Sequence, residues 1–160
     1  MARMFDVAEL VQVAVKDETA GVAFYSTLAQ TARHPALRAC FAGLANQERY
    51  HQKRFEDMLR SLGGYQAAEQ YPDEYLDYVT SLTTTRAFPE PEAAQQQARA
   101  CASDEAAIDL ALRFERDTLV LMNEMRGMVR EKDRAIVDEL IREERQHVVD
   151  LAAARQQQQH

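Results

Sequence analysis

The sequence has no tryptophan and only two cysteines, four prolines and five glycines in 160 residues. Its cysteines, Cys40 and Cys101, stand far apart, and neither belongs to a Cys-x-x-Cys pair. This spacing excludes a zinc site made of cysteines and a dithiol redox motif. We expect two reduced thiols that behave as small apolar residues.

Long apolar runs and an excess of basic residues are also missing. No stretch approaches the roughly 18 apolar residues of a transmembrane helix, and Asp6 and Glu9 stand where a signal peptide needs an apolar run. The 26 Asp and Glu outnumber the 19 Lys and Arg, which gives a net charge of -7. We therefore expect a cytoplasmic protein whose partners include no nucleic acid and no membrane.

The stretches between the few glycines and prolines have the apolar periodicity of α-helices, and strand-type alternation is absent. Cap residues and prolines set the expected limits of the helices. We expect four long helices, from the Asp6 cap to about Ala32, from Pro35 to about Leu62, from the Ser103 cap to about Arg130, and from about Asp133 past Leu151. His34 is expected to cap the second of them. The sequence predicts an all-α protein of one domain, residues 1–160.

Residues 63–103 separate the two helix pairs and predict a long crossover between helices two and three. This segment contains short helix candidates at about Pro72–Leu82 and after Pro91. The Gln-rich tail, residues 156–160, is expected to be disordered.

The two halves of the chain resemble each other. Glu18 in the first helix corresponds to Glu115 in the third, 97 residues later. At an offset of 96, the residues Leu44, Glu48, His51 and Phe55 correspond to Leu140, Glu144, His147 and Leu151. The chain is therefore a repeat of two helical hairpins that carry the same polar residues at the same depth.

These polar residues lie on the apolar faces of their helices. At about 100° per residue, Glu18 points the same way as Val11 and Tyr25, and Glu48 lies between Leu44 and Phe55. Four carboxylates buried together would repel one another and would need protons or cations. Two divalent ions would balance their formal charge, with neutral histidines completing the set.

The sequence contains Glu-x-x-His twice, as Glu48 to His51 and Glu144 to His147. Residues at this spacing lie on one helix face, so both side chains can reach one ion. Two such motifs and a glutamate from each remaining helix match the general ligand pattern of di-iron and di-manganese carboxylate bundles. The predicted metal ligands are Glu18, Glu48, His51, Glu115, Glu144 and His147.

The chain resembles the ferritin-like superfamily, and within it the di-iron domain of rubrerythrins, through all four helices. The segments that carry the resemblance are KDETAGVAFY, LANQERYHQKRFEDML, LRFERDTLVLM and LIREERQHVVDL. It implies a four-helix bundle with a long crossover, in which Glu48 and Glu144 bridge two metal ions. It also implies that Glu18 and Glu115 are terminal ligands and that His51 and His147 each bind one ion.

Rubrerythrins also carry a rubredoxin module with two Cys-x-x-Cys pairs, which the 160 residues lack. A separate protein is then the expected electron donor. The leading hypothesis is a di-iron oxidoreductase that oxidises Fe(II) with hydrogen peroxide or dioxygen, of the peroxide-scavenging or ferroxidase type, with a role in oxidative stress. The alternatives are a di-manganese catalase-like enzyme, an iron-binding, delivery or storage-associated protein without turnover, and a bundle that metal only stabilises.

Several residues beside the predicted site have two possible roles. Tyr25 either donates a hydrogen bond to a ligand carboxylate or packs in the core. Glu143 is rotated about 100° from Glu144, which favours a surface role. A second apolar face, with Val13, Phe24, Leu110 and Leu121, also needs a cover. We expect the crossover to cover one side and a second copy of the chain the rest, which predicts a homodimer or a larger assembly.

Overall fold

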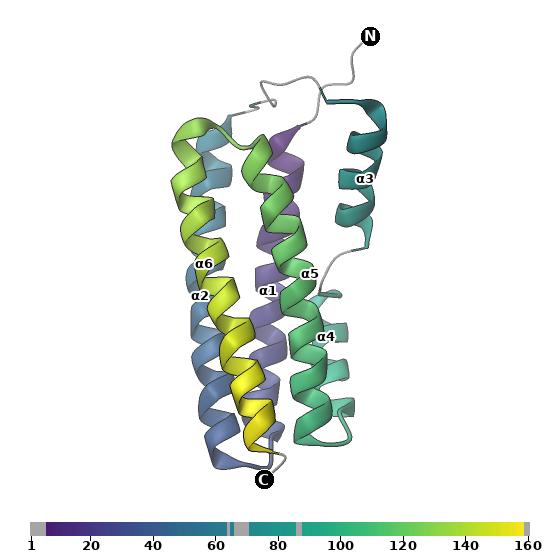
Figure 1. Cartoon of the computed structure of the whole chain (residues 1–160), viewed down its shortest axis with the longest axis vertical. Coiled ribbons are helices and arrows are strands. Elements are labelled where there is room, and N and C mark those ends of the chain that lie inside the picture. Colours follow the sequence, from purple (N-terminus) through teal and green to yellow (C-terminus); the bar gives the residue numbers. More distant parts are fainter. Residues whose placement is uncertain (1–5, 64, 66–70, 86–87, 159–160) are drawn as a thin grey trace.

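A computed structural model describes residues 6–63, 65, 71–85 and 88–158 (Figure 1). Every helix or strand that it assigns there is an α-helix. The helices are α1 (Val7–Thr31), α2 (Pro35–Leu62), α3 (Asp73–Thr84), α4 (Pro91–Ala100), α5 (Asp104–Met128) and α6 (Glu131–Gln157). In this part of the chain, no helix is long and apolar enough to cross a membrane.

Side-chain caps start three of the four long helices at the expected positions. Asp6 Oδ1 accepts a hydrogen bond from the Ala8 N–H at 2.8 Å, and Ser103 Oγ accepts one from the Ala106 N–H at 3.1 Å. His34 Nδ1 accepts from the Ala36 N–H at 3.2 Å, and Pro35 begins α2. These caps satisfy donors that a helix start leaves without partners, and they confirm the predicted starts of α1, α2 and α5.

The long helices form two antiparallel hairpins, α1 with α2 and α5 with α6 (Figure 1). The crossover leaves the end of α2, runs back along the bundle through α3 and α4, and reaches the start of α5 at the opposite end. As a result, α2 and α5 run in the same direction. This is the predicted four-helix bundle with a long crossover between its second and third long helices.

One expectation about the chain end is wrong. Helix α6 continues to Gln157, so two residues of the expected disordered tail are helical. Glutamine is a good helix former, and nothing in the Gln run breaks the helix. Residues 159–160 of that tail lie outside the described residues.

The bundle core consists of two apolar clusters with a polar layer between them. One cluster contains Tyr25, Phe41 and Leu151, and the other contains Val11, Phe55 and Met122. On each long helix a buried glutamate falls between residues of the two clusters. Met122, Met125 and Met128 are all buried in the second cluster. The apolar clusters therefore keep bulk water away from both sides of the polar layer.

The crossover covers much of the second apolar face, as expected. Helix α4 packs against α1, and α3 lies along α5 with Leu76 and Val79 fully buried. Between these helices, Phe88 packs edge-on against Phe24, with 5.7 Å between ring centroids, and its ring is tilted against that of Phe114, with 4.6 Å between centroids. Assembly with a second copy stays a prediction.

Candidate metal centre

The bundle brings the six residues singled out in the sequence into one buried cluster. Each long helix contributes one glutamate, and α2 and α6 each add a histidine three residues later. None of the six is more than 2% exposed: Glu18, Glu48, His51, Glu115, Glu144 and His147. The repeat explains the convergence, because it places matching polar residues at the same depth in both hairpins.

The cluster contains three overlapping sets of side chains that are close enough together to hold a metal ion. Two of them have four members: Glu18, Glu48, His51 and Glu144 in one, and Glu48, Glu115, Glu144 and His147 in the other. The third consists of His51, Glu144 and His147, and within each set the candidate ligand atoms all lie within 4.8 Å of one another. Glu48 and Glu144 belong to both four-membered sets, as the resemblance implies for bridging carboxylates.

Both histidines turn Nδ1 toward the carboxylates. His51 Nδ1 lies 2.7 Å from Glu144 Oε1 and 3.7 Å from Glu18 Oε2. His147 Nδ1 lies 3.0 Å from Glu144 Oε2, 3.4 Å from Glu48 Oε1 and 3.5 Å from Glu115 Oε1. The two rings are stacked, with centroids 5.4 Å apart and planes 16° from parallel. Glu144 therefore lies between the histidines, with one oxygen facing each.

Burial governs the protonation of the cluster. It raises the pKa of Glu18, Glu48 and Glu115 well above the usual carboxyl range, and the Glu144 charge adds to each rise. Burial also acts to raise the pKa of Glu144, but the nearby His147 ring and a hydrogen bond with His51 outweigh it and lower this pKa. Without a cation, burial therefore favours the protonated form of Glu18, Glu48 and Glu115, whereas the histidines favour the ionised form of Glu144.

The histidines are charged in the same state. Burial acts to lower the pKa of His51, but its hydrogen bond with Glu144 overcomes this effect and raises the pKa to about 9. The pKa of His147 rises further, because burial, which acts to lower it, is outweighed by the nearby carboxyl groups of Glu115, Glu144 and Glu48. A metal ion that binds these atoms must displace the protons.

The polar atoms of the cluster fit a metal ion. Both oxygens of Glu18, Glu48 Oε1, Glu144 Oε2 and both ring nitrogens of His147 are buried without a hydrogen-bond partner in the described structure. Buried polar atoms are costly when they stay unsatisfied. Carboxylate oxygens and imidazole nitrogens together suit iron, manganese or zinc. The donors fit a two-metal centre but do not select its metal.

Tyr25 has both of the roles considered for it. Its ring is fully buried in the aromatic core, and its hydroxyl donates a hydrogen bond to Glu115 Oε1. Burial, together with the Glu115 charge, raises the pKa of Tyr25, so the hydroxyl keeps its proton and remains a donor. Tyr25, which belongs to α1, therefore orients Glu115, a candidate ligand that belongs to α5.

The surface role expected for Glu143 describes only part of what this residue does. Its side chain is 37% exposed, but Glu143 Oε2 lies 2.6 Å from His51 Nε2. The rotation from Glu144 does place Glu143 away from the bundle axis. It also points Glu143 toward α2, where a long side chain reaches the outer edge of the His51 ring. The position of Glu143 on its own helix could not have predicted this contact with His51 on a neighbouring helix.

Gly21 was also not predicted as part of the site. A Cβ atom built on Gly21 would lie 3.3 Å from both Cδ and Oε2 of Glu48. The missing side chain lets Glu48 lie close against α1. A glycine inside a long helix is the sequence signal that could have indicated such a close approach.

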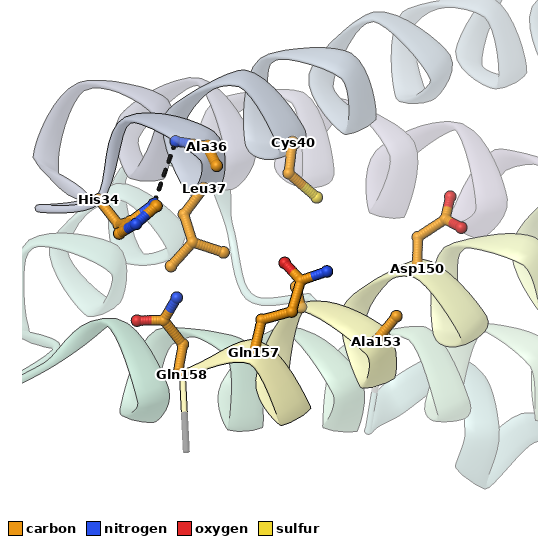
Figure 2. Close-up of a pocket in the computed structure, with 9 residues that line it drawn as sticks. His34, Ala36, Leu37, Cys40, Asp150, Ala153, Gln157 and Gln158 are labelled. Carbon is orange, nitrogen blue, oxygen red and sulfur yellow. Dashed lines mark hydrogen bonds between the residues drawn. The ribbon is translucent and has the colours of Figure 1, made fainter. Parts of the chain in front are cut away.

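Other titratable residues lie away from the cluster. His34 and Cys40, with Asp150, line a pocket of about 390 Å³ where α2 begins and α6 ends (Figure 2). None of the six candidate ligands lines this pocket. Both cysteines are free thiols and half-buried, in agreement with the expectation of reduced thiols.

The fold and the cluster define a ferritin-like helical bundle with a candidate two-metal centre. A family model described as Rubrerythrin matches residues 9–155, and the chain belongs to this family. Among solved structures, the chain is similar to one from Thermotoga maritima that is described as a proposed ferritin-like diiron-carboxylate protein. The two share 21% identity over 98% of each chain, with a TM-score of 0.72, which shows a common fold. No protein of curated function matches the chain.

Proposed function

We propose that this chain binds two iron ions in the buried cluster and uses them to reduce hydrogen peroxide or dioxygen. The observation that carries the proposal is the pair of metal-sized sets that share Glu48 and Glu144. Membership of the rubrerythrin family and the unpartnered buried atoms support it.

In this proposal Glu18 and His51 would hold one ion, Glu115 and His147 would hold the other, and Glu48 and Glu144 would be shared between them. When bound, two Fe(II) ions would supply the two electrons that, with two protons, convert one hydrogen peroxide into two waters. The hard anionic carboxylates favour the more highly charged state. The apolar layers on either side of the cluster exclude bulk water.

A separate electron-donor protein would return the centre to Fe(II). The sequence contains no Cys-x-x-Cys pair that could hold a rubredoxin-type iron. The two free cysteines come from different elements, Cys40 from α2 and Cys101 from the C-cap of α4. We therefore propose that turnover needs a partner, whereas a single oxidation does not.

The test is a stopped-flow titration of protein loaded anaerobically with two equivalents of Fe(II). Adding one equivalent of peroxide should oxidise both ions, seen as a rise in near-ultraviolet absorption. The Glu18→Gln variant should lose this stoichiometric reaction, while Glu92→Gln, at an exposed position in α4, should keep it. Failure of the unaltered protein to oxidise two Fe(II) per chain would refute the proposal.

Two other outcomes identify the alternatives. Iron that is retained but reoxidised no faster than free Fe(II) would indicate binding or delivery without turnover. Oxygen release from peroxide by the manganese-loaded protein, with an inactive iron form, would indicate a catalase-like enzyme.

A further inference from the structure

We propose that Glu143 is a positioning residue that makes the two metal-binding halves of the cluster unequal, with the His51 half the tighter. The proposal rests on the proposed two-metal function. It concerns a side chain outside the six candidate ligands.

His51 is held at both of its ring nitrogens. Nδ1 lies 2.7 Å from Glu144 Oε1 within the cluster, and Nε2 lies 2.6 Å from Glu143 Oε2 at its outer edge. When Nδ1 serves the metal, the Nε2–H group donates to the Glu143 carboxylate. Such an acceptor fixes the ring orientation and makes the imidazole a more basic ligand.

The other half of the cluster lacks this contact. His147 corresponds to His51 in the repeat, and the counterpart of Glu143, 96 residues earlier, is Gln47. Gln47 is exposed, and within the described structure His147 Nε2 is buried without a hydrogen-bond partner. The repeat therefore has a charged acceptor at one of two equivalent positions and a neutral amide at the other.

Both positions face the same part of the surface. Glu143 and Gln47 line one pocket of about 330 Å³, together with Asn46, Tyr50 and Gln146. Substitutions at Glu143 and Gln47 therefore remove comparable volume from a partly open site and leave both apolar clusters intact. This makes Gln47→Ala a matched control for Glu143→Ala.

The expected consequence is a difference in affinity. Removing the carboxylate partner of a metal-bound histidine typically weakens metal binding about 10–100-fold. We expect the Glu143 partner to strengthen the His51 half by this factor. The His147 half, which has no such partner, should bind its ion more weakly.

The experiment is an anaerobic Co(II) titration of metal-free protein, followed by visible absorption and calorimetry. The unaltered protein should bind two ions in two resolved steps. Glu143→Ala should weaken the tighter step about 10–100-fold, Glu143→Gln should weaken it less, and Gln47→Ala should change neither step. Thermal unfolding of each metal-free variant checks that the fold is retained.

Proton NMR of the Co(II)-loaded protein supplies a second readout. The paramagnetically shifted Nε2–H signal of His51 should exchange slowly with solvent in the unaltered protein. In Glu143→Ala this signal should broaden or disappear, because the proton then faces the open pocket. A purely structural role for Glu143 would leave the signal unchanged.

The outcomes distinguish a failure of the Glu143 positioning role from a failure of the proposed two-metal function. If Glu143→Ala binds both ions as the unaltered protein does, or weakens only the looser step, the positioning role is wrong and the two-metal function stands. If the unaltered protein fails to bind two ions, the proposed function itself is wrong.

Discussion

At the scale of single residues, Tyr25 connects the ligand cluster to the aromatic core beside it. Its ring stacks on Phe41, with 6.2 Å between centroids and 22° between planes, and meets Phe88 of the crossover edge-on at 6.4 Å. The hydroxyl at the other end of the same ring holds Glu115. Packing of the core therefore fixes the position of one oxygen of a candidate ligand.

Replacing Tyr25 with Phe should leave the fold intact and weaken metal binding by about 10-fold or more, because Glu115 loses the donor that orients it. Co(II) titration measures the change. Tyr75→Phe is the matched control, since Tyr75 donates to Glu124 in a half-buried contact outside the cluster. Equal metal affinities for the two variants would show that the Tyr25 hydroxyl is not needed for the site.

Gly21 offers a second test at this scale. Gly21→Ala should weaken metal binding, because the new Cβ, 3.3 Å from Glu48, must displace that carboxylate by a few tenths of an ångström. Gly43→Ala is the control, since Gly43 lies within α2 and has nothing within 4 Å of an added Cβ. The control should raise the unfolding free energy by about 1 kcal/mol through helix propensity alone and keep the metal affinity. Unchanged affinity in Gly21→Ala would contradict the close approach.

At the scale of helices, Asp104 connects the two hairpins at one end of the bundle. It is the first residue of α5, and its carboxylate accepts hydrogen bonds from the backbone N–H groups of Arg33 and His34. These two donors lie in the turn between α1 and α2. The Asp104 side chain therefore holds the turn between α1 and α2 next to the start of α5.

Asp104→Ala should lower the unfolding free energy by about 1.5–3 kcal/mol, the range for hydrogen bonds to a charged group. Denaturant unfolding of the metal-free protein measures it. Asp109→Ala is the control, because Asp109 forms an exposed ion pair with Arg155, which should contribute at most about 1 kcal/mol. A loss in Asp104→Ala no larger than in the control would rule out this connection.

The sequence was most informative about features that belong to one helix. Local caps at Asp6, His34 and Ser103 determine where helices start, and apolar phase identifies buried glutamates, so both could be predicted. Contacts between helices could not. The reach of Glu143 to His51 and the approach of Glu48 to Gly21 depend on how neighbouring helices are rotated and spaced. A single sequence carries no direct record of that rotation.

At the scale of the whole molecule, the protons in the cluster make stability depend on pH. The pKa of His51 is about 9 in the folded chain, against an ordinary value of 6.5. The folded state therefore binds more protons than the unfolded state between these values, and stability falls as pH rises. Below about pH 6.5 the contribution of His51 is fully present.

In metal-free protein the titration of His51 alone should accordingly cost on the order of 1–3 kcal/mol of unfolding free energy between pH 6.5 and 9.5. Metal binding should strengthen over the same range, because fewer protons remain to be displaced. Urea unfolding across this range, with and without Co(II), measures both trends. His51→Gln should make the metal-free profile shallower without flattening it, because the raised pKa of His147 acts in the same direction. An equally steep profile in that variant would assign the effect to the other groups.

The position of the crossover gives the molecule a thick side and a thin side. Helices α3 and α4 add a layer beyond α1 and α5, whereas α2 and α6 carry no such layer in the described structure (Figure 1). If the centre works as proposed, an external donor would reduce it fastest from the α2 and α6 side, because electron tunnelling rates fall exponentially with distance. The last steps of that route would pass the ring of His51, whose outer edge meets the partly exposed Glu143.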